Sequence, residues 1–166
     1  MTRLDIALDL IRQTRDYTVR MLETVDPADW FRQPNEGVTH VAWQVGHLAM
    51  AEYALCLVRT RGPRPDDEQL ISASFLKQFG RESVPVPDPA KYPSVSDIRD
   101  VFDRVHRQVL SELPGLGDSA LDEPTLKPHP LFTTKLGALL WCPRHEMSHV
   151  GQIGLLRRLM GKAPLW

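Results

Sequence analysis

Four long stretches of this chain carry apolar residues at helical spacing, and each is followed closely by proline or glycine. They cover residues 3–24, 39–61, 94–113 and 134–160. Apolar positions three and four residues apart fall on one face of an α-helix, so each stretch predicts an amphipathic or buried helix. No alternating strand pattern is found. The expected fold class is therefore all-α, a four-helix bundle that spans residues 1–166 as a single domain.

The connection between the second and third predicted helices, residues 62–93, is long and irregular. It is rich in proline and has room for one short helix at 67–79. Loops of this length are often functional. Two interpretations remain open at this stage: a long surface excursion, or a loop that covers the mouth of a pocket.

Composition and charge restrict the possible classes of function. The net charge is −1 and no basic stripe indicates a nucleic-acid surface. No apolar run reaches the roughly 18 residues of a membrane helix, and the first ten residues lack the apolar core of a signal peptide. The two cysteines, Cys56 and Cys142, form no disulfide framework. We expect a cytoplasmic protein that has neither a nucleic-acid nor a membrane partner.

Two histidines, His145 and His149, lie four residues apart in the last predicted helix. Four residues turn an α-helix by about 400°, so both imidazoles leave the same face and can reach one ion. Neighbouring apolar residues place the pair beside the core, where unpaired imidazoles are costly. The sequence HEMSH also fits H-E-x-x-H, the zinc motif of many metalloproteases, in which the glutamate is the general base. Glu146 is therefore a candidate base, or else a solvated helix residue.

A metalloprotease of this type needs a third metal ligand further along the chain. The metzincin pattern requires glycine and histidine where this chain has Gln152 and Leu155. No His, Asp, Glu or Cys follows His149. A third ligand must therefore come from upstream.

Among the upstream residues, His47 in the second predicted helix is the best candidate for the third ligand. The adjacent Gly46 lets a neighbouring backbone come close. His40, two turns earlier, is the rival, although a polar role at the helix start suits it better. Cys142, one turn before His145, is a further alternative. His106 is expected at the boundary of the core and His129 in a solvated loop.

Three histidines would form a neutral ligand set with at least one coordination position open, which is typical of catalytic zinc sites. Gln44 and Gln152 share the helix faces of the histidines and are expected to orient an imidazole or a bound water. Trp43 lies one turn from His47. We expect it to form a pocket wall or part of the core. Pro143 removes a backbone hydrogen bond and predicts a kink in the last helix.

Two segments resemble the DinB/YfiT-like superfamily, most closely its DinB_2 branch. They are VAWQVGHLAMAEY at 41–53 and HEMSHVGQIGLLRRLMGKAPLW at 145–166. The resemblance implies an up-down-down-up four-helix bundle and a dimer. It also implies a divalent metal, often zinc or nickel, held by His47, His145 and His149.

Characterised members of that superfamily include mycothiol-dependent maleylpyruvate isomerase and bacillithiol S-transferases. The resemblance thus implies a metal-dependent enzyme, a thiol S-transferase or a related transferase or hydrolase, with a low-molecular-weight thiol as cosubstrate. Arg81 or Arg144 could bind an anionic thiol, although a solvated surface arginine is the simpler interpretation of each. The alternatives are a non-catalytic, stress-related bundle that binds a metal or small ligand, and a zincin-type protease, which the missing downstream ligand disfavours.

Overall fold

The computed structural model describes residues 1–165 and is mainly helical, as predicted. Its longer helices are α1 (Arg3–Leu22), α2 (Val41–Glu52), α6 (Val95–Glu112) and α7 (Lys135–Leu159). The shorter elements are η1 (Pro27–Asp29), η2 (Tyr53–Val58), α3 (Arg59–Arg61), α4 (Asp67–Leu70), α5 (Ala73–Gln78), η3 (Pro89–Lys91), η4 (Leu113–Leu116), η5 (Asp118–Asp122), β1 (Pro124–His129) and β2 (Phe132–Thr134).

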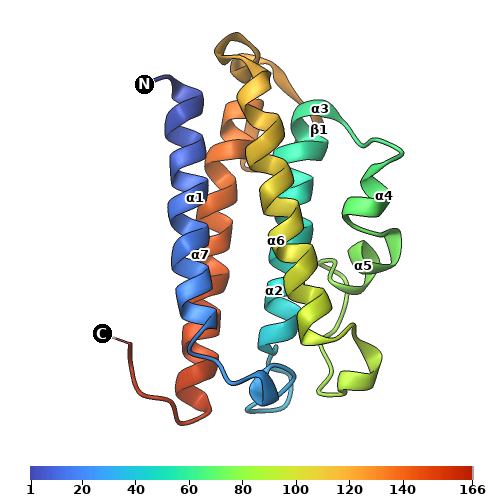
Figure 1. Ribbon diagram of the computed structural model, residues 1–166, viewed down its shortest axis with the longest axis vertical. Helices are drawn as coiled ribbons and strands as arrows, with labels where there is room; N and C mark the ends of the chain where they lie inside the picture. Colours follow the sequence, from blue (N-terminus) through green and yellow to red (C-terminus); the bar gives the residue numbers. More distant parts are fainter. Residues whose placement is uncertain (166) are drawn as a thin grey trace.

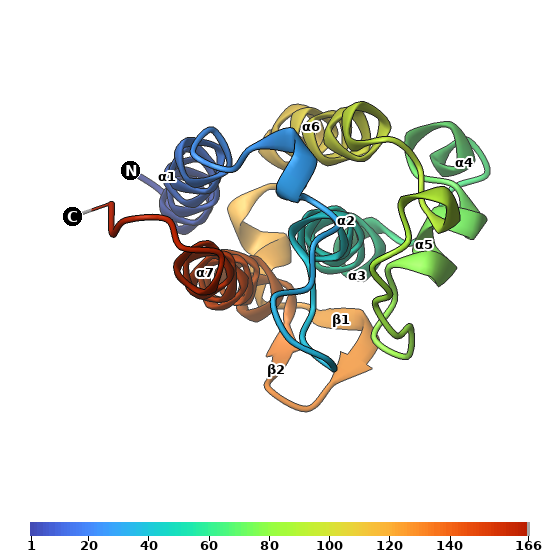
Figure 2. The same cartoon turned by 90° about the horizontal axis from the view of Figure 1, so that it is seen from below.

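The long helices lie side by side around one apolar core. Helix α1 packs along α7, and α2 packs along both α6 and α7. Figure 1 shows that α1 and α7 run in one direction, and that α2 and α6 run in the other. Seen along the helices in Figure 2, α4 and α5 lie outside this group, beyond α2 and α6. The core residues come from all four long helices, which therefore position each other.

Local sequence signals set where the helices begin. Thr2 caps α1 and Ser94 caps α6, and in both helices an aspartate three residues later completes a capping box. His40 caps α2, where its Nδ1 accepts the backbone N–H of Trp43 at 3.1 Å. This is the polar end role expected for His40.

The second predicted helix is continuous from Val41 to Arg61, but its middle is π-helical. Segment η2, Tyr53–Val58, joins α2 to α3, and no sequence pattern indicated it. By length and composition this stretch is apolar enough to cross a membrane, contrary to the sequence-based expectation. However, 83% of its most apolar window is buried inside the protein. That burial is the pattern of a core helix.

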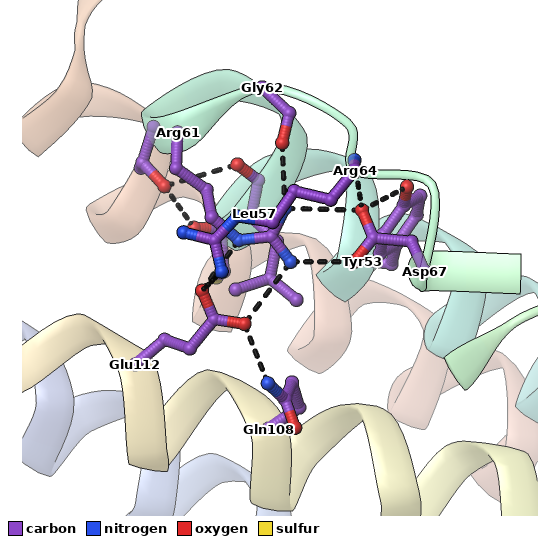
Figure 3. Close-up of polar contacts among 10 residues, drawn as sticks. Tyr53, Leu57, Arg61, Gly62, Arg64, Asp67, Gln108 and Glu112 are labelled. Carbon is purple, nitrogen blue, oxygen red and sulfur yellow. Dashed lines mark hydrogen bonds and ion pairs between the residues drawn. The ribbon is translucent and has the colours of Figure 1, made fainter. Parts of the chain in front are cut away.

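The connection at 62–93 packs on the long helices instead of running free. It contains two short α-helices, α4 and α5, where one helix was predicted, as well as the 3-10 turn η3, and it buries Phe75 and Phe79. Its start is held by Arg61, which pairs with Asp67 at 2.7 Å and with Glu112 at 2.6 Å (Figure 3). These ion pairs join the connection to α6 and hold it beside the core.

The segment before α7 forms a small antiparallel hairpin, which corrects the prediction that the chain has no strands. Strand β1 pairs with β2 between Pro124 and Thr134 and between His129 and Phe132, with an irregularity in between. Its prolines suggested a loop, but proline is tolerated in edge strands, and both strands of a two-stranded sheet are edges. The hairpin packs against α3 and α7.

Proline 143 lies inside α7, which stays helical on both sides of it. The ring is buried against the core. Thr134 caps this helix, with its hydroxyl oxygen accepting the N–H of Gly137, and Met160 ends it. The predicted limits of 134–160 are therefore correct to within one residue.

Candidate metal centre

Three histidines from two helices converge on one point of the structure. His47 comes from α2, and His145 and His149 come from successive turns of α7. One ligand nitrogen from each lies within 4.8 Å of the other two. The ring centroid of His47 lies 5.4 Å from that of His145 and 4.8 Å from that of His149. The structure thus brings together the three residues that the sequence singled out.

A pair of glutamines fixes the orientation of His149. The Nδ1 of His149 is hydrogen-bonded to the Oε1 of Gln44, and Gln44 Nε2 donates to Gln152 Oε1 at 2.9 Å. Because a carbonyl oxygen only accepts, Nδ1 must carry the proton, which leaves Nε2 unprotonated and able to bind a metal. Such orientation of a metal-ligating histidine through its other nitrogen is general in metal sites. Gln44 and Gln152 thus lie where the sequence predicted.

His47 is oriented by the connection at 62–93. Its Nδ1 donates to the carbonyl oxygen of Phe79 at 2.8 Å, so its Nε2 is also free. The indole of Trp43 stacks on the imidazole with centroids 4.7 Å apart and planes 12° from parallel. Trp43 in turn donates from Nε1 to Ser83 at 2.8 Å. Trp43 therefore forms a wall of the site, one of its two predicted roles.

The close approach predicted beside Gly46 is present, but its partner differs. The missing side chain of Gly46 makes room for the ring of Phe79, not for a backbone. A Cβ at this position would lie within 2.5 Å of ring carbons. The glycine therefore lets Phe79 reach the position from which its carbonyl oxygen holds His47.

The spacing and ionisation of the imidazoles suit a metal. The Nε2 atoms of His145 and His149 lie 3.2 Å apart, close to the roughly 3.3 Å between two nitrogens on a tetrahedral zinc ion. Burial lowers the pKa of His145 to about 4 and that of His149 to about 3, and it also lowers the pKa of His47. All three imidazoles are thus neutral near pH 7, as metal binding requires.

The histidines open into a cavity of about 690 Å³. Its walls come from α2, η2, α3, α7 and the hairpin, with one residue from the 62–93 connection. The lining residues are Trp43, His47, Met50, Ala51, Ala54, Leu55, Arg59, Arg81, Pro128, His129, Pro130, Leu131, Trp141, His145 and His149. A metal held by the three histidines would therefore have a position open to a ligand. The predicted candidate Arg81 is on this wall, whereas Arg144 is an exposed residue outside it.

The alternative third ligands lie elsewhere. His40 is fully buried at the start of α2, with its ring edge-on to Tyr92, and it does not join the histidine cluster. The Cys142 thiol contacts Cys56, and this contact together with burial raises its pKa well above the ordinary value. A protonated, buried thiol is a poor metal ligand. Cys56 is a core residue, as predicted.

Both roles predicted for Glu146 are wrong, because its side chain is neither solvated nor directed at the histidines. It is 3% exposed, and its carboxylate accepts hydrogen bonds from Arg15 Nε at 3.0 Å and from the Thr18 hydroxyl at 2.6 Å. Arg15 also pairs with Glu52 at 2.6 Å. A carboxylate engaged in this way holds α7 against α1 and is not available as a base at the metal site.

The two remaining histidines also have partners. His106 lies at the edge of the core, as predicted, where its Nδ1 contacts Glu52 at 2.7 Å. His129 was expected to be solvated, but it stacks on Phe132 with centroids 4.2 Å apart and lines the cavity. Sequence reasoning also missed Arg59 as a wall residue, because the π-helical turns that direct it there leave no sequence pattern.

Comparison with models of known protein families gives a match. A family model named DinB_2 and described as the DinB superfamily matches residues 10–153, which include all three histidines. Searches among curated proteins and among solved structures returned no match. The match covers well over half of the chain, so this protein belongs to the DinB superfamily.

Proposed function

We propose that this protein is a metal-dependent enzyme that uses a divalent cation held by His47, His145 and His149. The observation that carries the proposal is the convergence of three neutral imidazoles on an open cavity. Imidazole ligands suit zinc and nickel among the available divalent metals, and these are the metals we propose. When bound, the cation would lower the pKa of a thiol or water in its open position and supply a nucleophile near neutral pH.

The residues of the chain prepare this site before any ligand arrives. Gln44 and the Phe79 carbonyl hold two of the imidazoles with Nε2 free. The stacked indole of Trp43 shields one side of His47 from water. Because these groups are fixed by other protein contacts, little reorganisation is needed on metal binding. This preorganisation supports a site built for metal rather than a chance cluster.

Within this class we propose a thiol S-transferase or a related transferase or hydrolase, with a low-molecular-weight thiol as cosubstrate. Membership of the superfamily supports the proposal. The protease alternative loses support because Glu146, its required base, is bound by Arg15 and Thr18. The non-catalytic binder remains the second candidate. An absence of turnover of a chlorinated nitroarene, with several cellular thiols and several metals, would favour the binder.

Elemental analysis tests the metal ligands separately from any activity. Wild-type protein should contain stoichiometric metal, and His47→Ala and His145→Ala should contain almost none. His40→Asn is the matched control, because asparagine can replace the cap of α2 and His40 lies outside the cluster. Metal retained by His47→Ala would contradict the three-histidine site.

We also propose an up-down-down-up bundle, a single domain over residues 1–166, and a cytoplasmic homodimer with a small-molecule substrate. The antiparallel course of α1 against α2 and of α6 against α7 supports the topology (Figure 1). Exposed apolar side chains on α7, Met147, Leu155 and Leu159, support a partner surface. The free buried cysteines fit a reducing compartment.

A further inference from the structure

Arg59 brings a positive charge without a partner to the wall of the cavity. One of its terminal nitrogens donates to the carbonyl oxygen of Ala54 at 3.1 Å, while its Nε is buried and has no hydrogen-bond partner in the described part of the chain. Within residues 1–165 no carboxylate pairs with it. None of the residues that line the cavity is acidic either. A partly buried guanidinium that lacks a counterion is costly, so the cavity is suited to an anion.

The neighbouring Arg61, in the same helix, differs from Arg59 because it is paired with carboxylates. Its guanidinium is bound by Asp67 and Glu112, both within 2.7 Å (Figure 3). Two residues away, the contacts of Arg59 within residues 1–165 are a carbonyl oxygen and the ring of Phe132, whose centroid lies 5.9 Å from the guanidinium carbon. That distance is at the outer limit of a cation–π contact. The contrast indicates that the partner of Arg59 comes from outside the protein.

The π-helical segment η2 places Arg59 on the same face of the helix as His47. An α-helix advances about 100° per residue, so twelve α-helical residues would leave Arg59 about 120° away from His47. A π-helix bonds residue i to i+5 and advances only roughly 80° per residue. Over the six residues of η2 this difference removes about 120°. The π-turns thus bring metal ligand and arginine into one cavity, and π-bulges are frequent at functional sites.

The distance between the two groups indicates the length of the ligand. Arg59 folds back to the carbonyl of Ala54, and Ala54 lies about 10 Å beyond His47 along the helix axis at 1.5 Å per residue. Met50 and Ala51, which lie between His47 and Ala54 in the chain, line the cavity with apolar side chains, and Trp141 of α7 lines it as well. The cavity therefore has the three histidines at one end, apolar walls, and the positive charge of Arg59 at the other end.

We propose that Arg59 binds the carboxylate of an extended ligand whose apolar body crosses the cavity toward His47, His145 and His149. The guanidinium presents planar donors that match a carboxylate. His129 lines the same wall and offers a further ring nitrogen. The inference deepens the proposed function and depends on it only for the histidine end of the ligand.

Sulfanylalkanoates of increasing chain length, each compared with the sulfanylalkanol of the same length, test this assignment. Binding to the cobalt(II)-loaded protein is measured by calorimetry, and the cobalt absorption spectrum reports whether sulfur reaches the metal. At intermediate length the acid should bind roughly 10- to 100-fold more tightly than the alcohol, the effect of one hydrogen bond to a charged group. Arg59→Met should abolish that difference, and Arg59→Lys should keep part of it.

Two controls separate binding from folding. The alcohol should bind equally to the wild type and to Arg59→Met, which shows an intact cavity. Arg144→Met, an exposed arginine on α7 outside the cavity, should leave the acid affinity unchanged. Arg81 is exposed at the edge of the cavity, so Arg81→Met should lower the affinity for the acid by less than about threefold. A large loss in Arg81→Met with none in Arg59→Met would overturn the assignment.

The outcomes distinguish this inference from the proposed function. Equal affinity for acid and alcohol, together with a changed cobalt spectrum, would refute the role of Arg59. It would still agree with a metal bound by the three histidines. An unchanged spectrum with every thiol would count against the open metal position. In that case the binding of alkanoates without sulfur tests the role of Arg59 independently of the metal. Binding to the wild type that is lost in Arg59→Met supports the assignment, and equal binding by the two proteins refutes it.

Discussion

Replacement of Gly46 by alanine should disturb both the core and the candidate metal site. The added methyl group would lie within 2.5 Å of ring carbons of Phe79, whereas non-bonded carbon atoms need about 3.5 to 4.0 Å. The ring would have to move by about 1 Å or more. It is fully buried and packs against Phe75 at a centroid distance of 4.4 Å, so it has little room to do so.

Two opposing effects set the change in free energy of unfolding that Gly46→Ala should cause. Alanine in a helix interior is favoured over glycine by about 1 kcal/mol. Overpacking of a well-packed core costs about 1 to 3 kcal/mol. Gly151 in α7 provides the matched control, because a Cβ there meets nothing within 4 Å. Gly151→Ala should gain the helix term alone, so the two variants should differ in free energy of unfolding by about 1 to 3 kcal/mol.

Urea unfolding of metal-free protein measures this difference, and chelator competition measures the metal. A displaced Phe79 carbonyl no longer orients His47, so metal affinity should fall about 10-fold or more in Gly46→Ala. In a Phe79→Ala background there is no ring to displace. Gly46→Ala should then be stabilising there, as Gly151→Ala is. Equal stability of the two alanine variants in the wild-type background would refute the reasoning.

Three further predictions concern the surroundings of the histidines. Gln44→Leu removes the acceptor that orients His149, so the affinity for zinc should fall about 10- to 100-fold in a chelator competition; an unchanged affinity would contradict the proposed orientation. Glu146→Gln removes one carboxylate from buried Arg15 and should lower the free energy of unfolding by about 3 kcal/mol, while metal content stays stoichiometric; loss of metal would return Glu146 to the site. Burial lowers the pKa of His145 to about 4 and that of His149 to about 3. Since the unfolded chain binds these protons first, the stability of metal-free protein should fall as pH drops from about 6.5 toward 4, and less steeply in His145→Gln.

The positions of the helices and of two metal ligands could be read from local patterns. His145 and His149 share a face because four residues complete about one turn, which holds for any helix they occupy. His47 could be chosen only by elimination, since its nearness to α7 depends on how two helices pack. Glu146 was misassigned for the same reason. Its partner Arg15 lies 131 residues away, and only packing of α1 on α7 brings them together.

Other features left no recognisable signal in the sequence. The hairpin at 124–134 contains prolines that are typical of loops, and its strands form because they pack against α3 and α7. The π-turns of η2 lie in an apolar run that an uninterrupted α-helix would explain equally well. Their effect appears only in three dimensions, where they rotate Arg59 into the cavity. Phe79 likewise contributes through its backbone carbonyl, which any residue type would possess.

The sequence by itself determined the mainly helical class, the helix limits, and the shared face of His145 and His149. These features depend on spacing along one helix or on residue type, which are properties of local chain geometry. Only the tertiary structure decided which groups orient the imidazoles, that Glu146 is locked in a core ion pair, and that an unpaired arginine faces the cavity. Those contacts join residues from different helices, and their geometry is set by how the whole core packs.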